Sequence, residues 1–531
     1  MDWIQGYLSQ PNGAFPEPLP SPYHQPVNPQ FLFDQHYLDS SMETSSPSDT
    51  EMDLDMDLDV AVGSHYMRDV AIRESAAAEG VDEDRPDCFF KFLEEEFRQG
   101  TLSSELYQRS VYKTVDFPAV VTPQVLREHP ILDKQGLEWG TLFESGRRGS
   151  FLIPDGVCES VATHKALVRK LRYQRYAAYR PPPGVSPTIP GSEYSLLAFQ
   201  RCFTAPKPHL FHFQLRNLMY PVSSTQVFYN ANHMDDFQVD MLNPETGEQT
   251  VAISPDMCDP SLQQLRVSAL AANRNVVMLG STKGVFVVKP LSETAPSEKK
   301  TVLPSGMISS GNELQVNYIS LLSSSALISG NDNILRTLDL TSLKAKDSIL
   351  LPHAANATAF MPGSESVCVM ACDSPESHVY DTRSGKLQMS LQGHTDFGFA
   401  CAWSPDGKTV ATGNQDGTCR LYDIRGASNQ CIGAVSGKLQ AAIRSVDFDA
   451  SGRYLAMAEP VDYVTVVDTW SECAARQTIE FFGGTAGVRF TQSCSAGEYQ
   501  QLTIGVADET VGGVIQYLRP SQMQGEDFGF L

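Results

Sequence analysis

The sequence predicts an all-β fold, a ring of four-stranded sheets arranged as a seven-bladed β-propeller after an acidic N-terminal segment. Three observations predict it. From about residue 206 of the 531 residues, short β-rich runs alternate with clusters of Gly, Asn, Asp and Ser. These runs recur at a nearly constant period. Hydrophobic residues make up 41% of the chain, yet no run of about 18 apolar residues predicts a membrane-spanning helix, so we expect no membrane association.

The first 85 residues differ from the rest in composition. They contain 17 Asp and Glu against 3 Arg, so they carry a charge of −14 out of the net −23 of the chain. Seven prolines lie between residues 11 and 29, and carboxylates alternate with Met, Leu and Val over Asp53–Val60. We expect residues 1–85 to be disordered, because they cannot bury enough apolar surface to offset their ordering entropy. The alternation is typical of an acidic-hydrophobic interaction segment, and a solvated linker is the alternative.

Charge and cysteine usage limit the class of protein. The eleven cysteines are scattered, and the closest pair, Cys368 and Cys372, lacks the spacing of a zinc site. We expect reduced thiols, no metal and no cofactor. The N-terminus lacks a basic region followed by an apolar one, so we predict no secretory signal and a cytoplasmic and/or nuclear location. An acidic surface repels phosphate backbones, so we do not expect the protein to bind nucleic acid.

Residues 86–205 are expected to form a partly helical extension. The segment 88–97 has apolar residues at helical spacing, and a second candidate helix, 160–179, ends before three prolines. Residues 164–180 form a basic stretch interleaved with tyrosines. Such a stretch packs onto a neighbouring domain or binds an acidic partner, nucleic acid or the acidic segment of the chain itself.

Seven comparable strand starts support the ring. Their spacing is 41 to 50 residues with a mean of 45, and a period of roughly 40–45 is typical of a propeller blade. We therefore assign residues 206–520 to the propeller and 521–531 to a C-terminal tail. The seventh unit shows three strands, so we expect 209–214 (HLFHFQ) to supply its fourth strand and close the ring. The strand starts are Asn217, Val267, Val316, Ala357, Ala400, Ser445 and Gly487.

The clearest unit runs from residue 393 to residue 425. It begins with Gly-His, turns at Ser-Pro-Asp-Gly and ends its third strand with Tyr-Asp. It resembles a WD40 repeat, so the predicted fold is a WD40-type β-propeller. A buried carboxylate in a tight turn needs hydrogen-bond partners from neighbouring strands. The resemblance implies a structural hydrogen-bond tetrad of His394, Thr412, Asp416 and Tyr422, with Tyr in place of the usual Trp.

Four further phrases resemble one family of WD40 proteins from fungi and plants that is largely uncharacterised. The likeness covers about residues 200–520 and bears on the fold rather than on the function. The phrases are FQLRNLMY (213–220), ATGNQDGTCRLYDIR (411–425), LAMAEPVDYV (455–464) and EFFGGTAGVRF (480–490).

Two Tyr-Asp-x-Arg motifs lie 42 residues apart in adjacent units, at 380–383 and 422–425. They resemble the W-D-x-R motifs with which substrate receptors of cullin-type ubiquitin ligases dock their adaptor. A guanidinium at a rigid strand end can make paired bonds across an interface, and the alternative is local pairing with strand-end carboxylates. The candidate adaptor-binding residues are Tyr380, Asp381, Arg383, Tyr422, Asp423 and Arg425.

The sequence contains few signals of catalysis. Gly407-Lys408-Thr409 resembles the end of a phosphate-binding loop, but residue 402 is alanine where the motif needs glycine, and neither H-E-x-x-H nor G-x-S-x-G occurs. The repeat makes the pair His394 and Asp416 architectural rather than catalytic. Glu459, Asp462 and Asp508 either line one rim of the ring or lie in solvated turns. Ser150 and Ser46 are weaker candidates, for phosphorylation.

These observations predict a non-catalytic scaffold that binds partner proteins through its propeller faces, with no small-molecule substrate. One alternative is a substrate receptor of a cullin-type ubiquitin ligase, based on the two Tyr-Asp-x-Arg motifs. The second alternative is a transcription or chromatin regulator, based on the acidic-hydrophobic residues 52–60 and the basic residues 164–180.

Overall fold

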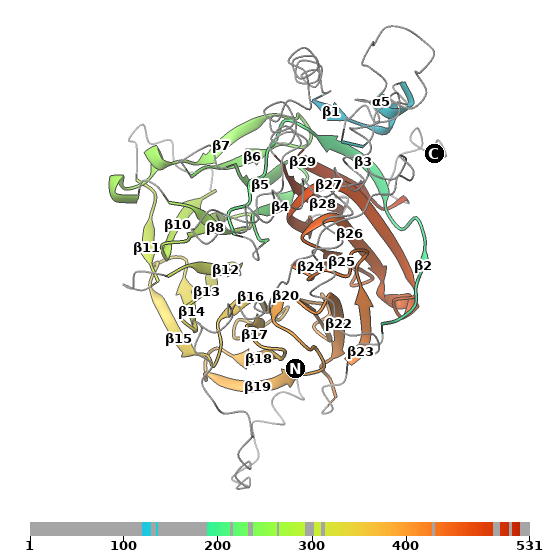
Figure 1. The fold of residues 1–531 in the computed structure, drawn as a ribbon. Helices are drawn as coiled ribbons and strands as arrows, with labels where there is room; N and C mark the ends of the chain where they lie inside the picture. The colour runs from blue at the N-terminus through green and yellow to red at the C-terminus, as the bar shows by residue number, and fades with distance from the viewer. Residues whose placement is uncertain are drawn as a thin grey trace, which may run out of the picture. The chain divides into compact units, whose positions relative to one another are not determined.

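A computed structural model gives the fold (Figure 1). Several predictions concern residues outside the described ranges: the disordered segment 1–85, the helices at 88–97 and 160–179, Ser46, Ser150 and the tail 521–531. The described residues are 119–128, 134–135, 188–212, 216–231, 237–262, 265–291, 302–308, 314–426, 431–491, 500–508 and 512–520.

Five antiparallel sheets of four strands follow one another along the described part of the chain. Within each sheet, strands that are consecutive in sequence are neighbours, as the repeated runs of the sequence predict. The strands are β4 (Met219–Ser223), β5 (Gln226–Asn230), β6 (Val239–Leu242), β7 (Gln249–Ile253), β8 (Val267–Ala272), β9 (Val276–Ser281), β10 (Val285–Pro290), β11 (Ser305–Met307), β12 (Val316–Leu321), β13 (Ser325–Gly330), β14 (Ile334–Asp339), β15 (Ala345–Leu350), β16 (Ala355–Phe360), β17 (Val367–Cys372), β18 (Ser377–Asp381), β19 (Lys386–Leu391), β20 (Gly398–Trp403), β21 (Thr409–Asn414), β22 (Thr418–Asp423) and β23 (Cys431–Ser436).

The remaining strands form one nine-stranded sheet. Its long strand β27 pairs with β26 through its first half and with β28 through its second half, so it belongs to two four-stranded groups. The predicted count of seven blades depends on dividing the sheet at β27. The strands are β1 (Val120–Val121), β2 (Ser192–Glu193), β3 (Ala198–Phe203), β24 (Ser445–Phe448), β25 (Tyr454–Ala458), β26 (Val461–Asp468), β27 (Ala475–Phe490), β28 (Gln501–Ala507) and β29 (Gly513–Leu518).

The first strands of the sheets form the inside of a ring (Figure 1). Among the described strands, β4, β8, β12, β16, β20 and β24 contact one another in chain order, and β27 contacts both β24 and β4. Both faces of an inner strand are covered by neighbouring sheets, so β8 and β20 are buried along their whole length. The outer strand β15 is mostly exposed. The core therefore lies between successive sheets, as in a β-propeller.

Helices are few and short in the described residues. They are α5 (Pro123–Glu128) and the 3₁₀ turns η2 (Pro255–Met257), η3 (Pro260–Leu262) and η4 (Thr469–Ser471). None of the described helices has the length and apolarity to cross a membrane.

The strand that closes the ring differs from the prediction. Residues 209–212, the described part of the predicted segment, form no strand; His209 instead donates its backbone N–H to the carbonyl of Asn230. The closing strand is β3, which pairs antiparallel with β29 and lies before the predicted start of the propeller. Pro206 and Pro208, which lack N–H donors, separate β3 from the segment that we had expected to close the ring.

Phe203 tests this closure. Its buried ring lies opposite Val514 of β29 and packs in one core with Met219 and Val227 of the first sheet, so it joins the two ends of the ring. We expect Phe203→Leu to lower the free energy of unfolding by about 1–2 kcal/mol through lost apolar burial. Phe397 is half-exposed and serves as the control, so Phe397→Leu should change the free energy of unfolding little. Denaturant unfolding measures both; equal effects would contradict a closing role for β3.

Candidate functional site

Strand direction divides the turns of the ring between two faces. Neighbouring strands of a sheet are antiparallel, so turns that follow first and third strands emerge on one face. Turns that follow second and fourth strands emerge on the other. We call these the third-strand face and the second-strand face. Both Tyr-Asp-x-Arg motifs lie at the ends of third strands, β18 and β22, and therefore on the same face of adjacent sheets.

Four successive sheets end their third strand with an aspartate. In each case one carboxylate oxygen accepts a hydrogen bond from the backbone N–H two residues further on, at 2.9–3.0 Å. This is the geometry with which Asp closes a turn on its own backbone. The aspartates therefore shape the third-strand face whether or not an arginine follows. They are Asp339, Asp381, Asp423 and Asp468.

The second Tyr-Asp-x-Arg motif uses its arginine within the turn. Arg425 donates to the two carboxylate oxygens of Asp423 from Nε at 2.9 Å and from Nη2 at 2.5 Å. These hydrogen bonds lower the pKa of Asp423 to about 2. Such a bidentate pair of hydrogen bonds is the strongest interaction that a guanidinium makes with a carboxylate. The contacts of Arg425 thus correspond to the local-pairing alternative.

The first motif differs. The backbone N–H of Arg383 donates to Asp381 at 3.0 Å, and Ser384 Oγ donates to the other oxygen at 2.9 Å. Arg383 is exposed, and we find no ion pair of its guanidinium among the described residues. The tyrosines of both motifs, Tyr380 and Tyr422, are buried. Only the Asp and Arg side chains of the motifs are thus open to a partner.

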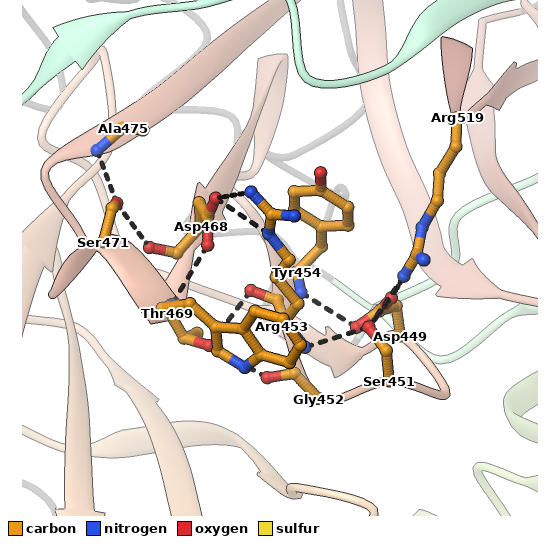
Figure 2. A network of polar contacts seen from close by, with 11 residues as sticks. Asp449, Ser451, Gly452, Arg453, Tyr454, Asp468, Thr469, Ser471, Ala475 and Arg519 are labelled. Carbon is orange, nitrogen blue, oxygen red and sulfur yellow. Dashed lines mark hydrogen bonds and ion pairs between the residues drawn. The ribbon is translucent and has the colours of Figure 1, made fainter. Parts of the chain in front are cut away.

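An exposed aromatic and cationic cluster lies on the same face, in the sixth sheet of the chain order (Figure 2). Asp468 Oδ2 accepts hydrogen bonds from Arg453 Nε at 3.0 Å and from Arg453 Nη2 at 2.7 Å. The held guanidinium lies 5.3 Å from the ring centre of Trp470 and 5.2 Å from that of Tyr454. Trp470 is 69% exposed. A large indole is therefore presented to solvent with a fixed cation against it.

A second carboxylate supports the cluster from inside. Asp449 is fully buried and accepts hydrogen bonds from the backbone N–H of Tyr454 at 2.8 Å and from Ser451 Oγ at 2.6 Å. It also forms an ion pair with Arg519, whose guanidinium lies 4.9 Å from the ring centre of Tyr454 (Figure 2). We call the four side chains Arg453, Tyr454, Trp470 and Arg519 the Trp470 surface. The sequence analysis missed it, because Arg453 and Trp470 meet only once β25 and β26 pair.

The predicted tetrad lies at the second-strand face. His394 Nδ1 is 2.9 Å from Asp416 Oδ2, and His394 Nε2 is 2.8 Å from Thr412 Oγ1. Burial lowers the pKa of His394, so the ring is neutral and donates one hydrogen bond to the carboxylate. The hydroxyl of Tyr422 donates to the carbonyl of Gln392 at 3.1 Å. Because His394 and Asp416 are both sealed from solvent, this pair has no access to a substrate.

A fifth side chain completes that cluster. Thr418 donates its backbone N–H and its hydroxyl to Asp416 Oδ1, at 3.0 Å and 2.7 Å. The turn between Asp416 and Thr418 needs glycine: Gly417 has φ +72°, and a Cβ there would lie 2.6 Å from the carbonyl of Gln440. The pattern Asp-Gly-Thr directly before a strand is the sequence signal that could have predicted the hydrogen bonds from Thr418 to Asp416.

Three acidic residues that we had placed at a rim or in solvated turns are buried instead. Glu459 accepts hydrogen bonds from the backbone N–H groups of Leu439 at 3.1 Å and Ala441 at 3.0 Å. Asp462 accepts one from Gly483 N at 3.1 Å. Asp508 is also buried. The solvated-turn alternative is wrong, because Glu459 and Asp462 bind backbone donors of neighbouring loops.

Comparison with known proteins places one blade in a family. Residues 385–423 match the family model described as WD domain, G-beta repeat. THO complex subunit 6 of Arabidopsis thaliana is 30% identical over 151 residues, which cover 28% of this chain and 39% of that protein. Coronin-7 of Rattus norvegicus is 35% identical over 85 residues, 16% of this chain and 9% of that protein. Ribosome biogenesis protein ytm1 of Neurospora crassa is 30% identical over 101 residues, 18% of this chain and 21% of that protein.

The chain spans less than half the length of these curated relatives. A solved structure, "Crystal Structure of Mitotic Checkpoint Complex", contains a chain that matches 63% of this chain and 98% of its own length, with a TM-score of 0.48 and 13% identity.

Fold and repeat together define the class. The described strands form a β-propeller in which residues 385–423 match a WD40 repeat, and proteins with WD40 repeats generally act as protein-interaction scaffolds. The predicted WD40 resemblance and the predicted all-β propeller fold are confirmed, and the count of seven blades stays a prediction. The narrower likeness to a family from fungi and plants stays a prediction.

Proposed function

We propose that this protein is a non-catalytic interaction scaffold and that a partner protein docks on its third-strand face, with the Trp470 surface as the anchor. The observation that carries the proposal is a 69% exposed indole fixed by a stacked arginine. Trp and Arg are enriched among the residues that dominate binding energy. A side chain that is already held in place loses little conformational freedom when it binds. Asp468 and Asp449 supply that restraint.

Electrostatics support a partner with carboxylates around an apolar pocket. Arg453 lies against the exposed Trp470 and Arg519 lies against the buried Tyr454; each guanidinium is paired with a carboxylate, Asp468 or Asp449. A guanidinium that one carboxylate already orients keeps further N–H donors, and these can bind a carboxylate of a partner. The similarity to a THO complex subunit and a ribosome biogenesis protein is in keeping with membership of a larger assembly. The cytoplasmic and/or nuclear location stays a prediction.

Affinity purification with mass spectrometry tests the docking surface. We expect Trp470→Ala to reduce recovery of the principal partner about ten-fold or more, because truncating a central anchor costs at least about 2 kcal/mol. The melting temperature should stay close to that of the unmodified protein, since the indole is exposed. Tyr194→Ala is the matched control, because Tyr194 is 57% exposed and lies outside this surface. The same partners at the same yield with Trp470→Ala would contradict the proposal.

The ligase-receptor alternative remains a second proposal for the same face. It is supported by the position of Arg383 and Arg425 at equivalent turns of adjacent sheets. For Arg425 to reach an adaptor, its bonds to Asp423 have to open. The same purification with Arg383→Ala/Arg425→Ala decides it: loss of a recovered adaptor supports the receptor, and absence of adaptor from the unmodified protein excludes it. The regulatory alternative depends on residues outside the described ranges.

A further inference from the structure

The interior of the ring contains a cluster of cations that the Trp470 surface does not use. Arg216 precedes β4, Arg444 precedes β24, and Arg489 lies in the second half of β27. Arg216 and Arg444 are 6% and 8% exposed. Burying a guanidinium is costly unless its charge and its donors are satisfied. Arg216 donates to the carbonyl of His212 at 2.6 Å, and the guanidinium of Arg444 lies 5.5 Å from the ring centre of Phe399. Three cations are thus concentrated at the inner strands of a chain with a net charge of −23.

Arg489 is satisfied within the protein. It donates to Tyr318 Oη at 2.5 Å and to Asn217 Oδ1 at 3.3 Å, and it lies 3.7 Å from the carboxylate of Asp447. Its guanidinium also stacks on Tyr220 at 4.4 Å from the ring centre. Arg489 is thus part of the structure and leaves little capacity for a ligand.

Asn217 lines the interior of the ring and has one half of its amide without a partner. Its oxygen accepts the bond from Arg489, so its nitrogen is left for another acceptor. This side chain is 5% exposed, and its Nδ2 is a buried donor with no hydrogen-bond partner among the described residues. A buried donor without an acceptor costs about 1–3 kcal/mol, so such groups are rare unless an acceptor arrives from outside.

Asn217 is one of the residues that line a small hollow inside the ring. The free volume of this hollow is about 10 Å³, which is room for one water-sized group. It adjoins a wider hollow of about 370 Å³ through the shared residue Asn356. The wider hollow opens among turns that follow second and fourth strands, so it belongs to the second-strand face. The small hollow is lined by residues from strands of four sheets and from the segments that precede β4 and β24, among them Arg216, Asn217, Tyr318, Phe399 and Arg444.

The potential in this interior is positive. His212, which lines the wider hollow, has its pKa lowered to about 4 by burial and by the charges of Arg216 and Arg444. The two nearby carboxylates have partners: Asp447 lies against Arg489, and Asp373 at the mouth accepts a hydrogen bond from Asn356 Nδ2 at 2.7 Å. Four of the nine residues that line the wider hollow are asparagines: Asn317, Asn331, Asn333 and Asn356. Amides can orient a peptide backbone without adding charge.

We propose that the ring binds an oxyanion carried by an acidic peptide segment. The segment occupies the amide-lined hollow, and one oxygen of its carboxylate or phosphate fills the small hollow, where it accepts a hydrogen bond from Asn217 Nδ2 between Arg216 and Arg444. Charge-assisted hydrogen bonds to such oxygens are about twice as strong as neutral ones. This site is on the face opposite the Trp470 surface and does not depend on that surface having a partner.

Calorimetric titration of the full chain tests the proposal in the unmodified protein first. The probes are a short Gly-Ser peptide with three central glutamates, the same peptide with three glutamines, and the same peptide with one central phosphoserine. We expect the glutamate and phosphoserine peptides to bind. The affinity of the glutamine peptide should be lower by a factor of about ten or more. Inorganic phosphate should compete with both acidic peptides. Equal affinity for the glutamate and glutamine peptides, or binding of phosphate without binding of either acidic peptide, would overturn the proposal.

Two variants test whether the oxyanion binds beside Asn217 and Arg444. Asn217→Asp keeps the shape of the side chain and replaces the donor by a repelling carboxylate. Arg444→Gln removes one positive charge. Each variant should lower the affinity for the acidic peptides about ten-fold or more. Arg453→Gln removes an arginine on the opposite face and should leave the affinity unchanged, even if it abolishes partner docking there. Should Arg444→Gln fail to fold, Asn217→Asp decides alone. Unweakened binding by Asn217→Asp at an unchanged melting temperature would overturn the proposal.

Discussion

Asp416→Ala is expected to lower the free energy of unfolding by about 3–5 kcal/mol. The carboxylate is buried and accepts hydrogen bonds from the imidazole of His394, from the backbone N–H of Thr395 and from both donors of Thr418. Burial alone would raise the pKa of Asp416, but these bonds outweigh it and lower the pKa, so the carboxylate is charged at neutral pH. Alanine leaves these four donors, three of them in the buried residues His394 and Thr418, without this acceptor.

Guanidinium unfolding of the full chain, followed by tryptophan fluorescence, measures this loss. Asp423→Ala is the matched control, because Asp423 also closes a turn of the same sheet but pairs with an exposed arginine. Exposed ion pairs contribute about 0–1 kcal/mol, so the control should stay within about 1 kcal/mol of the unmodified protein. If both variants lost the same small amount, the buried cluster around Asp416 would not be the stabilising feature of this blade.

The strand pattern could be predicted from the sequence because it is local. Gly, Asp and Asn turns recur with the period of the sheets, and the predicted strand starts Val267, Val316 and Ser445 are the first residues of β8, β12 and β24. The closing strand could not be predicted in the same way. β3 pairs with a strand more than 300 residues away in sequence, and a short segment near Pro206 matched the local pattern of a strand equally well.

The candidate surfaces depend on tertiary structure for the same reason. The sequence analysis weighed Arg383 and Arg425 because each is next to its aspartate in the chain. Trp470 and Arg453, by contrast, are 17 positions apart and meet through the pairing of β25 with β26. Asn217 and Arg444 precede the first strands of different sheets, β4 and β24, and both line the small hollow. No spacing along the chain signals such pairs.

The stability of the chain should fall with rising pH by a contribution of about 3 kcal/mol from Glu459. This carboxyl is 1% exposed, and burial raises its pKa from 4.5 to about 7 despite the hydrogen bonds from Leu439 and Ala441. A group whose folded pKa is raised stabilises the fold fully below the unfolded pKa, and this contribution is lost as the pH rises through the folded value. The window is therefore about pH 4.5 to 7.

Unfolding free energies of the unmodified protein and of Glu459→Gln, measured at pH 5 and at pH 8, isolate this effect. Glutamine does not titrate, so the difference between the two proteins should shift by 2 to 3 kcal/mol, on the order of two pKa units, in favour of the variant at pH 8. Asp447, whose pKa burial raises to about 6, acts in the same direction but is present in both proteins and cancels. Glu365→Gln, at an exposed position, should show no such shift. A pH-independent difference for Glu459→Gln would mean that the loop at 439–441 is held by a carboxylate that stays charged throughout, and that its backbone donors outweigh the cost of burial.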